Sequence, residues 1–193
     1  IEEPTIEGNR FIVRRTKNGD TGMLQNHVLL PEAGNAQIEK VGGKGKEFWV
    51  FGTNYPNDAL PNRPDDANER GAWRVEVSPA APATEDCFLN VMQVADNTCK
   101  RMHDVKRIDA EKVVGVQIAD RVVTFSRDSQ PLSGKVDMKV DGNAAMKFVI
   151  TDLIPGTWQI KKDGKVYIPA MEVRSDDGIL SFEGTAGHYE FLR

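Results

Sequence analysis

The chain is a succession of short apolar or alternating runs separated by glycine, asparagine, aspartate and proline. Many short strands with turn residues between them are typical of a sandwich or a barrel. None of the runs sustains a helical period for three turns. The sequence therefore predicts an all-β fold, an antiparallel two-layer β-sandwich. The expected strands lie within Arg10–Arg15, Met23–Leu30, Gln37–Val41, Glu47–Phe51, Trp73–Val77, Cys87–Val94, Val113–Ile118, Val122–Ser126, Lys135–Val140, Met146–Thr151, Thr157–Lys161, Val166–Val173, Ile179–Glu183 and Tyr189–Leu192.

Turn residues define the connections between these runs. Asn18-Gly19 and Asp163-Gly164 are the residue pairs that tight hairpin turns require, because both central residues of such a turn adopt positive φ. Gly42–Lys46 resembles a phosphate-binding loop in composition, but a strand follows it instead of a helix. Since a helix amino terminus gives phosphate loops their affinity for anions, we interpret this segment as a turn.

Composition limits the classes of function. With 193 residues and 39% hydrophobic content, the chain can form one two-layer domain or two small domains that share an interface. Its net charge of -4 gives no general attraction to nucleic acid or to an anionic membrane. No apolar run approaches the roughly 20 residues of a membrane-spanning helix. The start, Ile1–Pro4, lacks the parts of a signal peptide, so we expect a piece of a longer chain whose signal, if it is exported, has been removed.

Cys87 and Cys99 lie on either side of the apolar run Phe88–Val94 and the turn that follows it. A disulfide between them would suit an exported protein, and it requires both side chains to point to the same place. Two separate thiols are the alternative, and the sequence does not decide between them. No Cys-x-x-Cys or histidine pair is present, so no metal site is predicted here.

Catalytic residues do not stand out. The histidines, His27, His103 and His188, occur in different parts of the chain, and no serine-centred elbow or phosphate-cradling loop appears. His27 falls within a strand, where a structural role is the simpler interpretation. We therefore assign no catalytic residue and expect that this chain alone is not an enzyme.

Five segments together resemble the carboxy-terminal β-sandwich region of heparinase II/III-like polysaccharide lyases. They are Phe48-Trp49-Val50, the G-x-NYP segment Gly52–Pro56, Trp73–Pro79, the E-D-x-FLNV segment Glu85–Val91, and Leu153–Trp158. The resemblance implies that the tyrosine and histidine of the lyase reaction belong to a helical toroid domain, which is not encoded here. It also implies a small sandwich together with part of a second, larger sheet layer.

The resemblance leads to a functional expectation for residues 1–193 as one β-sandwich module. We expect a non-catalytic accessory domain of a periplasmic or secreted polysaccharide lyase that acts on uronic-acid-containing glycans. Its partners would be an acidic polysaccharide and the catalytic domain of the same parent enzyme, and it would aid stability and substrate contact. The alternatives are an independent carbohydrate-binding module and a structural or adhesion-type sandwich with protein partners, because fold alone does not separate these classes.

The candidate carbohydrate contacts are of two kinds. Tyr55 and Arg63 belong to a polar loop over residues 54–70, which is longer than most structureless connections, and Trp158 follows Pro155-Gly156, where we expect a partly exposed ring. Trp49 and Trp73 are expected in the core. The densest basic segment supplies Lys100, Arg101 and Arg107 for contact with a polyanion.

No cofactor is predicted. The oxygen-bearing side chains of the 54–70 loop could hold calcium, since hard cations take six or more oxygen ligands, but the spacing matches no known calcium loop. A purely structural, solvated loop is the simpler alternative.

Overall fold

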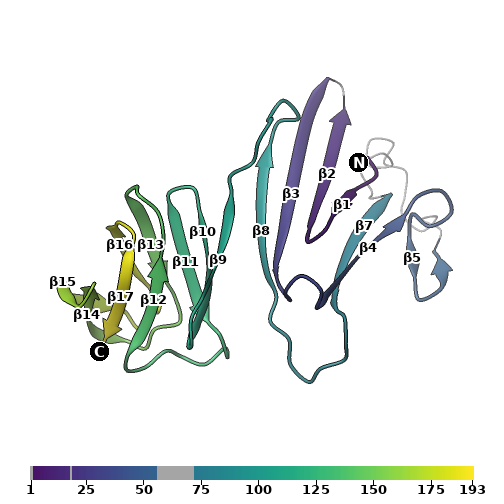
Figure 1. The fold of residues 1–193 in the computed structure, drawn as a ribbon. Coiled ribbons are helices and arrows are strands. Elements are labelled where there is room, and N and C mark those ends of the chain that lie inside the picture. Colours follow the sequence, from purple (N-terminus) through teal and green to yellow (C-terminus); the bar gives the residue numbers. More distant parts are fainter. Residues whose placement is uncertain (1, 18, 56–71) are drawn as a thin grey trace. The chain divides into compact units, whose positions relative to one another are not determined.

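The computed structural model describes residues 2–17, 19–55 and 72–193, and all regular elements in these ranges are β-strands (Figure 1). This confirms the predicted all-β class. The chain divides into two compact units, Ile1–Met102 (unit 1) and His103–Arg193 (unit 2). That both units act as one module over residues 1–193 remains a prediction.

The main sheet of unit 1 has four strands in the order β1-β2-β3-β8. Neighbouring strands are antiparallel throughout this sheet. The Asn18-Gly19 hairpin prediction is supported by the pairing of Lys17 with Asp20 and by φ of 88° at Gly19. The strands are β1 (Thr5–Glu7), β2 (Arg10–Lys17), β3 (Asp20–Leu30) and β8 (Leu89–Ala95).

Unit 1 also contains two small antiparallel pairs. β4 (Ala36–Gly42) pairs with β7 (Trp73–Pro79), and β5 (Trp49–Val50) pairs with β6 (Thr53–Asn54). Between β4 and β5, the Lys46 backbone amide donates to the Gly43 carbonyl at 2.9 Å, which confirms the predicted turn.

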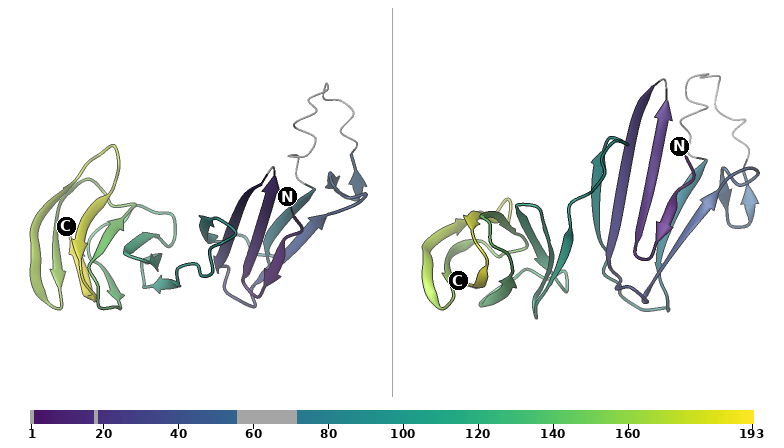
Figure 2. Two further views of the ribbon diagram at one scale, coloured as in Figure 1. Left: turned by 90° about the horizontal axis from the view of Figure 1, so that it is seen from above. Right: turned by 45° about the horizontal axis from the view of Figure 1, so that its top comes forward.

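Unit 2 consists of two sheets (Figure 2). One has the order β16-β13-β11-β10-β9 and the other β12-β17-β14-β15. The strands of the first sheet are β9 (Val105–Asp109), β10 (Val113–Ile118), β11 (Arg121–Ser126), β13 (Met146–Ile150) and β16 (Leu180–Gly184). Those of the second are β12 (Val136–Val140), β14 (Gly156–Lys162), β15 (Lys165–Val173) and β17 (Gly187–Leu192).

A single apolar core joins the two sheets of unit 2. Phe148 and Phe182 from the first sheet stack at a centroid distance of 4.8 Å, and Tyr189 from the second sheet lies 4.8 Å from Phe148. Trp158 and Phe191 of the second sheet are fully buried in the same cluster. Two sheets that bury their inner faces against each other form the predicted β-sandwich.

One pair of named strands in unit 2 departs from the antiparallel prediction. β11 and β13 are parallel neighbours, with Val122 opposite Phe148. Between them the chain crosses to the other sheet as β12 and then returns, so β13 enters the first sheet in the same direction as β11. A crossover of this kind is what parallel neighbours require, and alternation in sequence carries no information about it.

Candidate functional site

Tyr55, the predicted aromatic contact of the 54–70 loop, lies in an exposed position. It follows β6 directly, its backbone amide donates to the Phe48 carbonyl at 3.3 Å, and its side chain is 56% exposed. Arg63 and the remainder of the 54–70 loop beyond Tyr55 lie outside the described residues, and so does the candidate calcium site.

The expectation of a partly exposed ring at Trp158 is wrong. The side chain is fully buried, and its indole Nε1 donates to the Ile154 carbonyl at 3.0 Å. Trp158 occupies the same face of β14 as buried Ile160, because side chains two residues apart on a strand point the same way. A buried ring offers no face to a sugar. The ring of Tyr189 is buried as well, and Trp49 and Trp73, which we expected in the core, are half-buried.

The predicted basic segment is divided between the two units. Lys100 and Arg101 are exposed at the end of unit 1, whereas Arg107 lies on β9 of unit 2. Arg107 forms an ion pair with Asp109 at 2.6 Å. The three cations therefore do not form a patch within one unit, and their contact with a polyanion remains a prediction.

Cys87 and Cys99 are both free thiols. They lie beyond opposite ends of β8, and a seven-residue extended strand separates its ends by about 20 Å, whereas the Cα atoms of a disulfide are roughly 4.4–6.8 Å apart. The Sγ atom of Cys99 instead contacts the Arg101 carbonyl at 3.3 Å. The structure thus corrects the candidate disulfide in favour of two separate thiols.

The histidines lie in three different places: His27 on β3, His103 before β9, and His188 on β17. Burial, followed by the positive charge of Arg10, lowers the pKa of His27. His27 faces Arg10 across the β2–β3 pair, so the sheet favours a neutral imidazole. Within residues 2–17, 19–55 and 72–193, no cluster of three or more His, Cys, Asp or Glu side chains is placed to hold a metal ion.

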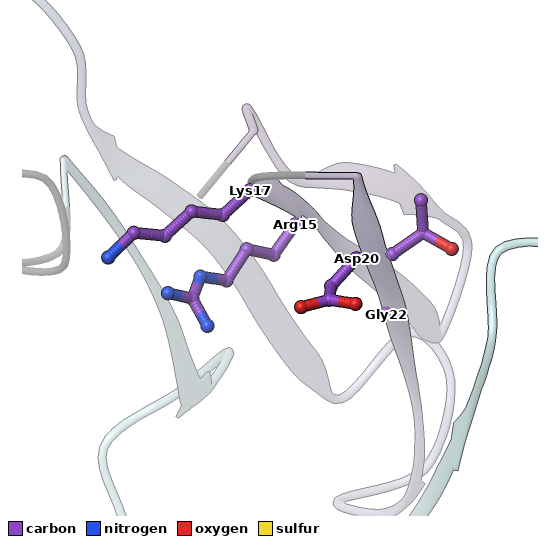
Figure 3. Close-up of a pocket in the computed structure, with 5 residues that line it drawn as sticks. Arg15, Lys17, Asp20 and Gly22 are labelled. Carbon is purple, nitrogen blue, oxygen red and sulfur yellow. The ribbon is translucent and has the colours of Figure 1, made fainter.

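A hollow of about 400 Å³ lies at the turn end of the β2–β3 hairpin (Figure 3). Arg15 and Lys17 extend to the same side of the sheet, and Gly22, opposite Arg15, leaves space beside them. Side chains alternate between the two faces of a strand, so Arg10 and Arg14 lie on the other face of β2. The four basic residues of β2 are therefore divided between its two faces. Asp20 also lines the hollow, and its carboxylate offsets part of the positive charge of Arg15 and Lys17.

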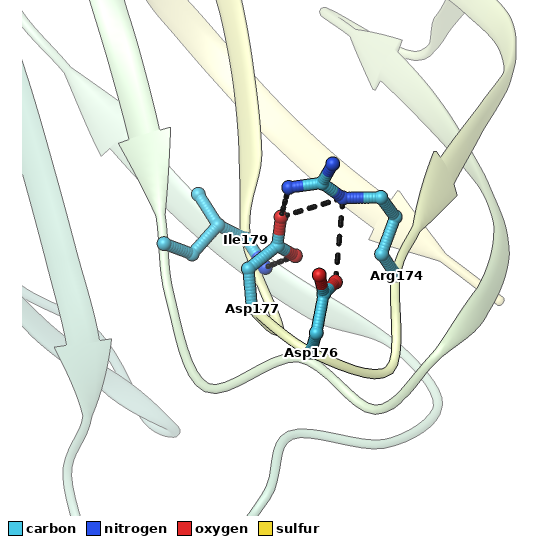
Figure 4. Close-up of polar contacts among 4 residues, drawn as sticks. All are labelled: Arg174, Asp176, Asp177 and Ile179. Atoms are coloured by element: carbon cyan, nitrogen blue, oxygen red, sulfur yellow. Dashed lines mark hydrogen bonds and ion pairs between the residues drawn. The ribbon is translucent and has the colours of Figure 1, made fainter.

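A second hollow, of about 270 Å³, lies in unit 2 beside the loop between β15 and β16. Arg174 at its rim is held by Asp177, whose Oδ2 accepts from Nε at 2.9 Å and also from Nη2, and by Asp176 at 3.4 Å (Figure 4). The hydrogen bond from Arg174, with a second one from the Ile179 amide, lowers the pKa of the Asp177 carboxyl. This cluster fixes the loop, and we interpret it as structural.

The clearest exposed feature is the segment from Lys44 to Tyr55, which we call the aromatic hairpin. Val50 pairs with Thr53, so Phe51 and Gly52 are the two central residues of its turn. Phe51 is 100% exposed, and Val50 and Tyr55 are 42% and 56% exposed. Tyr55 and Val50 share one face of the hairpin, since the Tyr55 amide bonds to Phe48 two residues before Val50.

Phe51 has a strained backbone. Its φ is 45° and that of Gly52 is 84°, which matches the two positive φ values of a type I′ turn. This turn favours Asn-Gly or Asp-Gly, and the Asp163-Gly164 turn of unit 2 has both φ values positive, at 50° and 77°. A bulky residue in this region is an outlier that costs about 1–2 kcal/mol. The aromatic ring at Phe51 therefore occupies a position where a smaller residue would be more stable.

Polar contacts hold the base of the aromatic hairpin. The Phe48 amide donates to Asn54 Oδ1 at 2.8 Å, and the Glu47 carboxylate accepts from the Gly45 amide at 3.0 Å. Backbone hydrogen bonds, from Glu47 itself and then from Gly45, lower the pKa of the Glu47 carboxyl. Lys46 Nζ lies 5.2 Å from the centroid of the Trp49 ring. The hairpin thus presents aromatic rings together with an exposed ammonium group.

The family comparison concerns the other half of the molecule. The family model described as "Heparinase II C-terminal domain" matches residues 107–193, which comprise nearly all of unit 2. Residues 107–193 are thus similar to the heparinase II C-terminal domain, in agreement with the resemblance predicted from the sequence. Of the segments that carry the sequence resemblance, Leu153–Trp158 lies inside the match and the other four precede it. No curated protein matches the chain.

The residues that match this family model form the two-sheet sandwich of unit 2, and the aromatic hairpin lies in unit 1 outside the matched residues. Sequence reasoning selected Tyr55 in this hairpin but missed Phe51, because it treated Glu47–Phe51 as one strand. The available signal was Phe51-Gly52 itself: a glycine directly after a short apolar run indicates a turn, and a phenylalanine at a turn is exposed. In the described residues, no helix has the length and apolar character to cross a membrane.

Proposed function

We propose that the chain is a non-catalytic accessory region of a secreted or periplasmic polysaccharide lyase that acts on uronic-acid-containing glycans. The family match over residues 107–193 is the observation that carries this proposal. The heparinase II C-terminal domain implies a polysaccharide-acting parent enzyme with its own catalytic domain. The accessory region aids the stability of that enzyme and contacts its substrate.

The distribution of acid–base groups supports a non-catalytic role. Elimination at a uronic acid needs a base near C5, a proton donor for the leaving oxygen, and a positive or amide group that neutralises the carboxylate. His27 lies on β3, His188 lies on β17 and His103 precedes β9, whereas the exposed Tyr55 follows β6. The chain therefore contributes binding surface, and the catalytic domain of the parent supplies the reaction.

Unit 1 supports the role of packing against the catalytic domain. Its edge strand β8 carries Met92 and Val94 on one face, and these side chains are 66% and 78% exposed. Apolar side chains exposed next to each other on a strand indicate a surface that another protein domain covers. A covering domain would also shield the edge of β8, which carries no charged residue.

An independent carbohydrate-binding module is the second candidate. The aromatic hairpin favours it, because carbohydrate binding by a sandwich domain uses exposed aromatic rings, and Phe51 and Tyr55 are exposed. Both candidates contact glycan, and they differ in whether the chain also packs against and stabilises the catalytic domain of a parent enzyme.

The test is a calorimetric titration of the 193-residue chain with alginate, heparan sulfate, chondroitin sulfate and hyaluronan, with ultraviolet absorbance recorded for unsaturated products. We expect saturable binding of at least one glycan and no rise in absorbance. A rise in absorbance would overturn the non-catalytic assignment. Absence of binding to all four glycans would overturn the proposed substrate contact by this chain.

A further inference from the structure

We propose that the aromatic hairpin is a stacking site for a sugar ring of an acidic glycan, with Phe51 as the ring that the sugar covers. This inference rests on the proposed function, and it names the residue and the ligand chemistry through which the substrate contact is made.

The side chain of Phe51 does not stabilise the described structure by burial. Its side chain is completely exposed, so folding buries none of its apolar surface, and its backbone has φ of 45°. Strained residues of this kind are concentrated at ligand clamps and binding loops. The Asp163-Gly164 turn shows that this protein makes the same type of turn with a residue suited to it. The aromatic ring of Phe51 is therefore best explained by contact with a ligand.

The surroundings fit a pyranose ring. The face of an aromatic ring carries partial negative charge, and the C–H groups on one face of a pyranose carry partial positive charge, so the two stack. Val50 directly precedes Phe51, Tyr55 lies opposite Phe48 further along the same hairpin, and both side chains are exposed. Tyr55 adds a phenol hydroxyl and Thr53 an alcohol hydroxyl, which are suitable partners for sugar hydroxyl groups.

The charge of the hairpin favours an acidic sugar. Between residues 44 and 55 the sequence contains Lys44, Lys46 and one carboxylate, Glu47, whereas the whole chain has a net charge of -4. Lys44 and Lys46 are exposed, while Glu47 is turned to the backbone amide of Gly45. The two ammonium groups can therefore pair with the carboxylate or sulfate of a glycan.

The experiment compares Phe51→Asn with the wild-type chain in calorimetric titrations with hexasaccharides of alginate, heparan sulfate, chondroitin sulfate and hyaluronan. Asn-Gly is the favoured sequence for this turn, so the variant keeps the hairpin and removes only the ring. We expect roughly tenfold weaker binding. Tm should remain unchanged or rise by roughly 4 °C because strain is relieved.

Two further variants test the chemistry. Phe51→Trp retains an aromatic face and should bind at least as tightly as the wild type, and Phe88→Asn, at a phenylalanine that is 48% exposed elsewhere in unit 1, should leave binding unchanged. If the wild type binds and Phe51→Asn binds equally well, the stacking site is wrong and the proposed function stands. If Phe51→Asn lowers Tm, the ring has a structural role and the inference is overturned. If the wild-type chain binds none of the hexasaccharides, the proposed substrate contact and this inference both fall.

Discussion

In unit 2, β16 alternates between buried and exposed side chains, whereas in unit 1 β7 alternates between half-buried and exposed ones. Both strands have the same period of two in their sequences. The difference lies in what covers the inner face. In unit 2 that face packs against a second sheet, and the apolar residues of both sheets form one cluster.

Unit 1 buries fewer apolar side chains. Among its described residues they are Met23, Val28, Leu29 and Leu89. Full burial of a large apolar side chain contributes about 1.5–3 kcal/mol, so half-buried strands gain much less from the hydrophobic effect. An alternating pattern thus identifies a strand and its apolar face, but the depth of burial depends on a partner layer.

The largest effect is expected when Trp158 of unit 2 is truncated. Trp158→Ala removes a fully buried ring and its hydrogen bond to the Ile154 carbonyl. Loss of the ring from a packed core should lower the free energy of unfolding by about 3–5 kcal/mol. Urea denaturation followed by circular dichroism measures this change.

Trp73→Ala in unit 1 is the matched control for Trp158→Ala. Trp73 is half-buried, with the Lys40 ammonium 5.9 Å from its ring centroid, so its truncation should cost roughly 1–2 kcal/mol. An equal decrease in the free energy of unfolding for the two variants would show that the core of unit 1 is as well packed as that of unit 2.

A smaller effect is expected for glycine-to-alanine substitutions. A Cβ atom at Gly115 in unit 2 would lie 2.2 Å from the Val123 carbonyl oxygen, whereas at Gly22 in unit 1 no atom lies within 4 Å. Gly115→Ala should destabilise the protein by about 1–3 kcal/mol because the backbone of the neighbouring strand has to move. Gly22→Ala should be close to neutral. Thermal unfolding measures both, and a destabilised Gly22→Ala would mean that the hollow at Arg15 and Lys17 is tightly packed.

The smallest effect is a difference between the two units in the pH range over which each loses stability. The pKa of His27 in unit 1 is below its unfolded value of 6.5, so its contribution to stability is present above pH 6.5 and is lost as the pH falls through the folded pKa. Hydrogen bonds, from Lys135 and from Arg174 respectively, lower the pKa of Glu190 and Asp177 in unit 2. The contributions of these carboxylates are lost only as the pH falls below their unfolded values of 4.5 and 3.8.

Hydrogen exchange of amides assigned to each unit distinguishes the two ranges of pH. Unit 1 should begin to lose stability just below pH 6.5, before unit 2 does, and His27→Gln should remove that early loss. Simultaneous loss in both units, unaffected by His27→Gln, would contradict the assignment of the early step to His27.

The strands and turns follow largely from the sequence. The Asp163-Gly164 pair predicted a hairpin, and the structure places Lys162 opposite Lys165 with positive φ at both turn residues. The prediction of a strand over Glu47–Phe51 was correct only in part, because Trp49–Val50 alone is a strand and Phe51 starts a turn. β1 and β6, at three and two residues, are too short for a periodic signal.

The candidate site was harder to predict. The candidate contact Tyr55 is exposed, whereas Trp158 is buried because its strand faces a second sheet. We expected exposure because Pro155-Gly156 marks a turn directly before this strand. A turn signal indicates the backbone conformation, but it does not indicate whether another sheet covers the strand. Likewise, the basic residues of Lys100–Arg107 are neighbours in sequence, but the division between the units separates Lys100 and Arg101 from Arg107.

The sequence by itself determined the all-β class, the positions of most strands, the glycine turns and the resemblance to heparinase-like lyases, which the family match confirms for the carboxy-terminal part. These properties arise from backbone preferences and side-chain alternation over a few residues, which are local. Only the tertiary structure decided the division into two units, the burial of Trp158, the separation of Cys87 from Cys99 and the full exposure of Phe51. Each of these depends on which distant strands pair and which sheet faces meet, and the periodicity of a single strand does not encode such contacts.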